Sequence, residues 1–277
     1  MGLPYLEPPS LSPRIPIHVF GVIVTIGIMI GTAVMVRYAK HRGQSEQEAR
    51  RVASWVCVIG FIGAHVLDVL FYRPGEALRH PIVLLEIWTS ISSYGGFVGG
   101  GLAFLYIAWR KRLRLGTWAD ITVVGLLVAF SIGRAGCTVV HDHVGAPTSS
   151  AIGVDFPRAA LASRGVLDDM HSDAPVIRAH DLGLEELLYL IPVNLLVLWL
   201  AFRRRLPDGL LAALAAALYA PVRFGLEHWR LVTTDPLYSG LTFAQWCSIA
   251  VFAIAAVVAG RVALTSWPGR CRRRART

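Results

Sequence analysis

Seven long apolar runs dominate this sequence of 277 residues and limit what it can fold into. A helix that crosses a lipid bilayer needs about 20 mostly apolar residues, and each run supplies close to that number. Charged residues make up only 16% of the chain, against about 25% in soluble domains. The sequence therefore predicts an all-α integral membrane protein with one polytopic domain over residues 1–277. The predicted spans are residues 16–36, 52–72, 91–109, 119–140, 182–202, 209–226 and 243–263.

The basic residues are distributed unevenly between the linkers, and this predicts the orientation of the chain. Of the 27 lysines and arginines, 18 lie in alternate linkers and the C-terminal segment. Because positively charged linkers stay in the cytoplasm, we expect the N-terminus outside and the C-terminus in the cytoplasm. We interpret the net charge of +9 as a topology signal, and we expect no nucleic-acid partner. The basic segments are residues 37–51, 110–118, 203–208 and 261–277.

The longest segment between spans, residues 141–181, is polar and rather acidic, and this orientation places it outside. Segments of this length are often functional. We expect an external loop that holds one or two short helices at most.

Two arginines, Arg134 and Arg223, lie within predicted spans, near their external ends. Ionisable groups at membrane depth are costly and are candidates for function. A guanidinium binds phosphate through two parallel hydrogen bonds and stays charged at any physiological pH, so the two predict a clamp for one phospholipid phosphate. The alternative is a structural role, in which Arg223 pairs with Glu227 four residues on and Arg134 pairs with Asp142. The two roles are compatible.

A His-Asp-His sequence at residues 141–143 allows three interpretations. His141 or His143 could act as a general base, each could be a solvated or structural histidine, or the pair could contribute to a metal site. A zinc site needs further ligands at suitable spacing, and the cysteines show neither zinc nor disulfide spacing. We therefore expect no metal and no other cofactor. The cysteines are Cys57, Cys137, Cys247 and Cys271.

Two further groups of polar or small residues lie inside the spans. His65 and Asp68 stand three residues apart, where we expect a hydrogen-bonded pair between helices, with a proton relay as the alternative. A glycine-rich stretch in the third span favours close helix packing or approach of the backbone to a lipid over a phosphate loop. These glycines are Gly95, Gly96, Gly99, Gly100 and Gly101.

Six motifs, in this order along nearly the whole chain, resemble those of prolipoprotein diacylglyceryl transferases. The most specific has a glycine and an arginine followed by an acid and a closing glycine. The motifs are IHVFG (17–21), SYGGFVGG (93–100), IGRAGCTVVHDHVGAPT (132–148), HDLGLEE (180–186), VRFGLEHWR (222–230) and LTFAQWCS (241–248).

The resemblance implies a multi-pass enzyme of the bacterial inner membrane that acts at its periplasmic face. Such an enzyme would move the diacylglyceryl group of phosphatidylglycerol onto the cysteine thiol of a prolipoprotein signal peptide. The family motifs imply site roles for Arg134, Asp142, Gly145, His180, Glu186, Arg223 and Glu227, with Tyr94, Gly95, Gly96 and Cys137 expected in the substrate site.

The chemistry of that reaction assigns roles within this set. The departing glycerol phosphate carries negative charge, which the preorganised cations Arg134 and Arg223 would stabilise in the transition state. The acceptor thiol is mostly protonated at neutral pH and needs a base. His141 or His143 could supply that base, with Asp142 orienting its neighbours or pairing with Arg134.

The chain departs from the family pattern at several polar positions. Asp142 stands where the family usually has glutamate. Six other positions also differ from the residue usual in the family. Tyr94 stands in place of a histidine, Cys137 in place of an asparagine and Phe20 in place of a tyrosine. His65 stands in place of an arginine, Gly183 in place of a glutamine and Glu185 in place of a tyrosine. A non-catalytic or re-specialised relative that binds phospholipid or lipoprotein signal peptides is therefore the alternative. A transporter is disfavoured because the polar residues crowd the external half and no internal repeat is seen.

Overall fold

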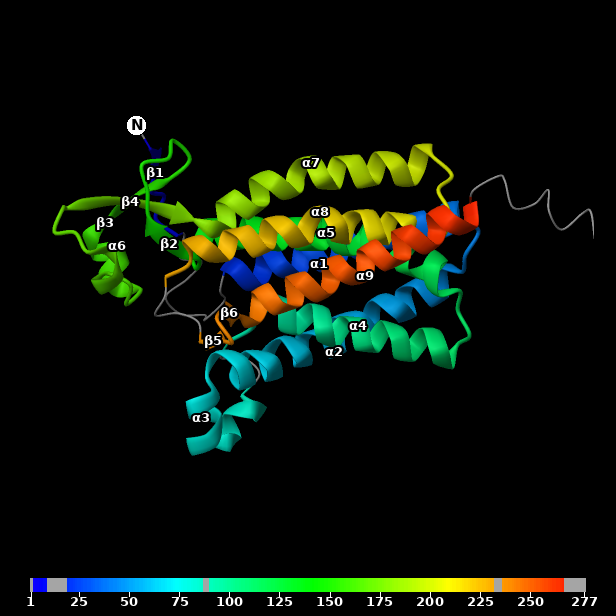
Figure 1. Cartoon of the computed structure of the whole chain (residues 1–277), viewed down its shortest axis with the longest axis horizontal. Helices are drawn as coiled ribbons and strands as arrows, with labels where there is room; N and C mark the ends of the chain where they lie inside the picture. Colours follow the sequence, from blue (N-terminus) through cyan, green and yellow to red (C-terminus); the bar gives the residue numbers. More distant parts are fainter. Residues whose placement is uncertain (1, 9–18, 87–89, 232–235, 267–277) are drawn as a thin grey trace, which may run out of the picture.

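The computed structural model describes residues 2–8, 19–86, 90–231 and 236–266 as a bundle of long helices with a small sheet at one end, the sheet end (Figure 1). Six helices of these residues are long and apolar enough to cross a membrane, which confirms a helical multi-pass protein. The start of the predicted span 16–36 lies outside the described residues. The six helices are α1 (Val19–His41), α2 (Glu46–Tyr72), α5 (Leu115–Val140), α7 (Leu182–Arg203), α8 (Leu210–Leu226) and α9 (Phe243–Ser266).

The third predicted span forms α4 (Ser93–Arg110), an 18-residue helix that packs along α2. Glycines set the approach of these two helices. A Cβ atom on Gly63 would lie 2.7 Å from the Gly99 Cα, and one on Gly95 would lie 2.6 Å from the Gly63 carbonyl oxygen. Close packing of small residues is thus confirmed for Gly95 and Gly99.

The other end of the bundle is fastened by Asp120 of α5, which is fully buried. Its carboxylate accepts hydrogen bonds from the backbone N–H groups of Gly209 and Ala212 at 2.8 and 2.9 Å. These groups belong to the first turn of α8, where N–H donors have no partner within their own helix. Arg42, which pairs with Asp208, lies 3.9 Å from the same carboxylate. One side chain therefore joins α5, α8 and the end of α1.

At the sheet end, residues 141–181 provide three strands of a four-stranded sheet, where the sequence predicts a loop. The strand order is β1-β3-β4-β2, with β1 parallel to β3 and the other pairs antiparallel. Alternating side chains of β3 and β4 are buried in a small core around Phe156, Leu161 and Ile177. The all-α prediction therefore holds for the bundle but not for this segment. Its elements are β1 (Leu3–Pro4), β2 (Val144–Pro147), β3 (Val154–Pro157), α6 (Arg158–Ser163), η2 (Asp168–Met170) and β4 (Val176–Asp181).

Short elements complete the sheet end. An isolated bridge between Gly145 and Arg230 attaches the sheet to the segment after α8. The short helices after α2 project sideways from the bundle (Figure 1). These elements are α3 (Pro74–Arg79), η1 (Pro81–Leu85), η3 (Glu227–Trp229), β5 (Leu237–Tyr238) and β6 (Leu241–Thr242).

Replacing Asp120 with alanine should destabilise the protein. The change leaves the N–H groups of Gly209 and Ala212 buried without their acceptor, at a cost of about 1–3 kcal/mol. Chemical denaturation of the purified protein in detergent would measure it. As a matched control, Glu46→Ala removes an exposed carboxylate of α2 and should leave the transition unchanged. Equal stability of Asp120→Ala and the parent would rule out the capping role.

Candidate active site

Arg134 of α5 is 2% exposed and is paired with a carboxylate from another helix. Its Nε lies 3.0 Å from an Oε of Glu186 on α7, a charge contact that is not aligned as a hydrogen bond. The second oxygen of Glu186 accepts a 2.7 Å hydrogen bond from the Tyr219 hydroxyl. The prediction that Asp142 forms the ion pair with Arg134 is therefore wrong, because the carboxylate in that ion pair belongs to Glu186.

The rest of the Arg134 guanidinium is also in contact with protein groups. One Nη donates to the Ser93 hydroxyl at 2.9 Å, and the other lies 3.6 Å from the sulfur of Cys137. The guanidinium carbon lies 5.0 Å from the centroid of the Phe130 ring. A charge held this way is preorganised, since it needs little rearrangement to respond to a negative group.

Arg223 of α8 is 5% exposed and forms the predicted ion pair with Glu227, which is confirmed. Glu227 also accepts a 2.8 Å hydrogen bond from the hydroxyl of Thr242, and it lies 3.5 Å from Arg230. The Arg223 guanidinium stands 5.8 Å from the centroid of the Tyr94 ring. Two arginines and two carboxylates thus lie buried at the sheet end of the bundle.

A polar cavity of about 280 Å³ opens at this end. Arg223, Tyr94 and His143 line it, and they are three of the residues that the sequence predicts for the site. Arg134 does not line it but lies behind Ser93, which does. Asp68, which the sequence predicts in a hydrogen-bonded pair, also lines it. The lining residues without a predicted role are Tyr72, Arg73, Ser90, Ile91, Ser92, Ser93 and Arg230. Of these, Ser93 and Arg230 belong to quoted motifs, and serines at the start of a helix are common caps.

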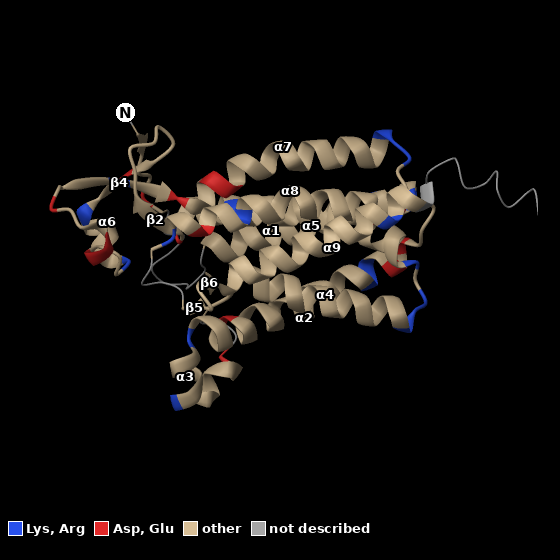
Figure 2. Ribbon diagram, viewed as in Figure 1, with Lys and Arg blue, Asp and Glu red and all other residues tan. Residues whose placement is uncertain are grey.

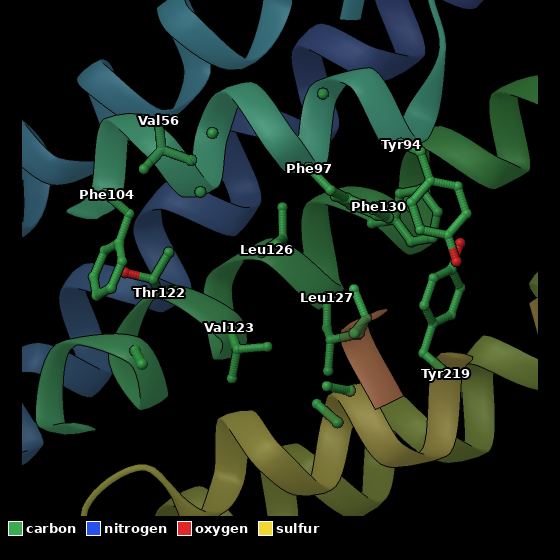
Figure 3. A pocket seen from close by; sticks show the side chains of 17 residues that line it. Val56, Tyr94, Phe97, Phe104, Thr122, Val123, Leu126, Leu127, Phe130 and Tyr219 are labelled. Carbon is green, nitrogen blue, oxygen red and sulfur yellow. The ribbon is translucent and has the colours of Figure 1, made fainter. Parts of the chain in front are cut away.

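A second cavity, also of about 280 Å³, extends from Tyr94 along α4, α5 and α8 (Figure 3). Its walls are almost entirely apolar. Tyr94 lines both cavities, and its hydroxyl hydrogen bonds to Ser248 of α9. Gly96 and Gly100 contribute walls without side chains, which agrees with the expected exposure of backbone. A charged cavity and an apolar one therefore share Tyr94 as part of their walls.

The His-Asp-His residues point in different directions. His141 is buried, with Nδ1 2.5 Å from a carboxylate oxygen of Asp181 and Nε2 3.2 Å from the Leu6 carbonyl oxygen. Both partners accept hydrogen bonds, so His141 holds the N-terminal segment against the sheet. His143 instead faces the polar cavity, with Nδ1 2.9 Å from Asp142.

The neighbours of Asp142 change the pKa of its carboxyl group. Burial raises the pKa of its carboxyl group, but the charge and hydrogen bond of His143 and the charge of Arg134 outweigh that effect. The pKa of Asp142 therefore lies below its ordinary value. The residue is ionised at neutral pH.

The remaining predicted residues surround this centre. The His180 ring stacks on Trp229 at 4.9 Å, and its Nδ1 lies 2.5 Å from Glu185. Gly145 is required by space, since a Cβ there would lie 2.6 Å from the Trp229 carbonyl oxygen. Gly183 packs against Cys137, where a Cβ would meet the cysteine Cβ at 3.0 Å.

His65 and Asp68 do not form the predicted pair. Each His65 ring nitrogen lies within 3.0 Å of a backbone carbonyl, those of Ser90 and Val83. Asp68 instead accepts a hydrogen bond from the Ser90 hydroxyl and lies 3.5 Å from Arg73. The two residues therefore order the segment before α4 without a relay between them.

The family model described as prolipoprotein diacylglyceryl transferase matches residues 9–260. The chain belongs to this family. Similar proteins include the phosphatidylglycerol–prolipoprotein diacylglyceryl transferase of Frankia alni, at 29% identity over 88% of this chain and 63% of that protein. The chain thus spans less than two thirds of the length of this relative.

Two further relatives match over more of their length. One is phosphatidylglycerol–prolipoprotein diacylglyceryl transferase 2 of Streptomyces coelicolor, at 30% identity over 91% of this chain and 79% of that protein. Another is the phosphatidylglycerol–prolipoprotein diacylglyceryl transferase of Cereibacter sphaeroides, at 26% identity over 82% of both chains. The family motifs of the sequence thus coincide with the two buried ion pairs and the two cavities.

Within this family member, removal of Glu186 should destabilise the fold. Glu186→Ala leaves Arg134 buried without its carboxylate, and breaking a buried pair on one side costs about 3–5 kcal/mol. The double variant Arg134→Met/Glu186→Leu, which removes both charges, should unfold closer to the parent. Detergent-based denaturation of the three proteins would test this. If the single and double variants unfold alike, the ion pair does not control stability.

Proposed function

We propose that this chain transfers the diacylglyceryl group of phosphatidylglycerol to the cysteine thiol of a prolipoprotein signal peptide. The observation that carries the proposal is the polar cavity with Arg223 and His143, which lies beside an apolar cavity and shares Tyr94 with it. A phospholipid has the same division into a charged head and apolar chains. The names of the relatives supply the reaction and the two substrates.

The phosphate of the lipid is assigned to the arginine side of the polar cavity. Arg223 lines that cavity, and Arg134 lies behind it, where it donates a hydrogen bond to the lining residue Ser93. A guanidinium offers a fork of N–H donors that matches phosphate oxygens. Because the leaving glycerol phosphate gains negative charge as its bond to the glyceryl carbon breaks, these cations stabilise the transition state more than the bound lipid. Glu186 and Glu227 hold the two guanidinium groups in place.

An acyl chain is assigned to the apolar cavity. The cavity lies among helices that are apolar enough to cross a membrane, so a chain enters it from the bilayer without crossing water. Gly95 supports the Tyr94 end of this cavity by bringing α4 onto α2.

The acceptor thiol is assigned to the His143 side, where Asp142 and Cys137 also lie. His141 is a positioning residue in this proposal, because Asp181 and Leu6 occupy its ring nitrogens. Gly145, His180 and the neighbouring Trp229 shape the edge of the sheet beside the site.

The sheet end is assigned to the periplasmic side of the bacterial inner membrane. With α4 as a seventh span, the N-terminus lies outside and the C-terminus in the cytoplasm. Lysines and arginines gather at the helix ends opposite the sheet, the side that positive charge favours in the cytoplasm (Figure 2). A prolipoprotein signal peptide then meets the site from the outer half of the bilayer.

The activity is tested directly with labelled phosphatidylglycerol and a peptide that carries the signal-peptide cysteine. The purified chain should transfer label to the peptide, and it should rescue a bacterial strain depleted of its own transferase. Folded protein that binds the lipid without transferring label would support the alternative, a relative that only binds phospholipid or signal peptides.

The arginines should not tolerate replacement by lysine. Arg223→Lys and Arg134→Lys keep the charge but lose the fork of donors, and we expect a loss of transfer rate of about 100-fold, as for loss of one preorganised donor. Arg79→Lys, at the end of α3, is the matched control and should keep the parental rate. Transfer at the parental rate by both site variants would exclude the phosphate assignment.

A further inference from the structure

Three potential metal ligands lie close together where α5 ends. Cys137 is on the last turns of α5, and Asp142 and His143 follow the end of that helix. His141 ends α5 with a φ of 50°, a left-handed conformation that redirects the chain. The ligand atoms of Cys137, Asp142 and His143 all lie within 4.8 Å of one another.

These three side chains form a donor set suited to zinc. Thiolate, imidazole and carboxylate are its usual protein ligands, and a site with three of them leaves a fourth position for a substrate. Ligand atoms around a tetrahedral zinc ion lie about 3.6 Å apart, given bonds of about 2.0–2.3 Å. Side-chain rotations that move atoms by roughly 1 Å would therefore close the cluster around an ion.

The charges around the cluster also fit a divalent cation. A Cys137 thiolate and the Asp142 carboxylate together balance two positive charges. Arg134 lies 3.6 Å from the Cys137 sulfur, but its own charge is balanced by Glu186. Its N–H group is also placed to donate to a thiolate. The Nδ1 of His143 lies 2.9 Å from an oxygen of Asp142, so the imidazole and the carboxylate already face each other.

Two residues that depart from the expected family pattern, Cys137 and Gly183, are in contact at this cluster. Cys137 stands where the family has asparagine, and Gly183, which stands where it has glutamine, touches Cys137. Tyr94, which replaces the family's histidine, donates its hydroxyl to Ser248, whose own hydroxyl donates to the Ala244 carbonyl. The Tyr94 hydroxyl is therefore bonded to α9, and the cluster at Cys137 brings together thiol, carboxylate and imidazole groups.

We propose that Cys137, Asp142 and His143 bind one zinc-class divalent ion, whose fourth position takes the acceptor thiol. This inference rests on the proposed function for the role of the ion but not for its binding.

The reaction balances without an oxidant or a reductant. A zinc-class ion held by Cys137, Asp142 and His143 would bind the acceptor sulfur as thiolate, and the thiol proton would pass to water. The sulfur then attacks the glyceryl carbon of the lipid. The bond from that carbon to the phosphate oxygen breaks, and its electron pair leaves with glycerol phosphate on the arginine side.

Metal binding is measured on the full chain in detergent, stripped of metal and titrated with Zn²⁺ against a chromophoric chelator. We expect one ion per chain. Cys137→Asn and His143→Ala should each weaken binding by more than about 100-fold, since loss of an outer partner alone costs about 10–100-fold. Cys57→Ser and His228→Ala, which change the same residue types elsewhere, should bind as the parent does.

A second measurement identifies the ligand and guards against misfolding. Co²⁺ bound by the parent should give a thiolate-to-metal charge-transfer band, and this band should be absent in folded Cys137→Asn. No ion at stoichiometric Zn²⁺, or unchanged binding in both site variants, would overturn the inference. Full transfer by metal-free protein would overturn the role of the ion and leave the proposed function intact. Specific Zn²⁺ binding without any transfer of label would overturn the proposed function and leave the metal site intact.

Discussion

The interaction on which this structure depends is the pairing of two buried guanidinium groups with carboxylates of the bundle. In a low-dielectric surrounding an unpaired charge costs several kcal/mol, so Arg134 fixes where Glu186 must lie, and Arg223 does the same for Glu227. Arg134 and Glu186 belong to α5 and α7, and Thr242 extends the second pair to the start of α9. The groups that give the site its charge therefore also set the helix positions at the sheet end.

The two cavities follow from this arrangement. Polar side chains concentrate where the ion pairs lie, and glycines, alanines and aromatic rings fill the adjoining part of the bundle. Tyr94 suits the junction because its ring is apolar and its hydroxyl has a partner in Ser248. The family reaction requires an amphipathic lipid to stay in the bilayer while its headgroup bond reacts. A charged cavity beside an apolar one, with Tyr94 in the walls of both, suits such a lipid.

Two of the departures from the expected family pattern are related through a direct contact. Cys137 and Gly183 are in contact, and Cys137 also lies beside Arg134, Asp142 and His143. A smaller residue at 183 makes room for the cysteine. Cys137 and Gly183 lie on the side of the site that we assign to the acceptor thiol, whereas Tyr94 lies beside Arg223.

The sequence alone determined the membrane bundle, the ends of most helices and the positions of two charges within it, Arg134 and Arg223, because apolar length and a charge at membrane depth have few physical solutions. It also determined the Arg223–Glu227 pair, which lies within one helical turn. Only the tertiary structure decided that Glu186 is the partner of Arg134, that His141 and His143 face different ways, and that residues 141–181 form a sheet. These features depend on contacts between distant segments and on strands of four to six residues, whose short patterns resemble a loop.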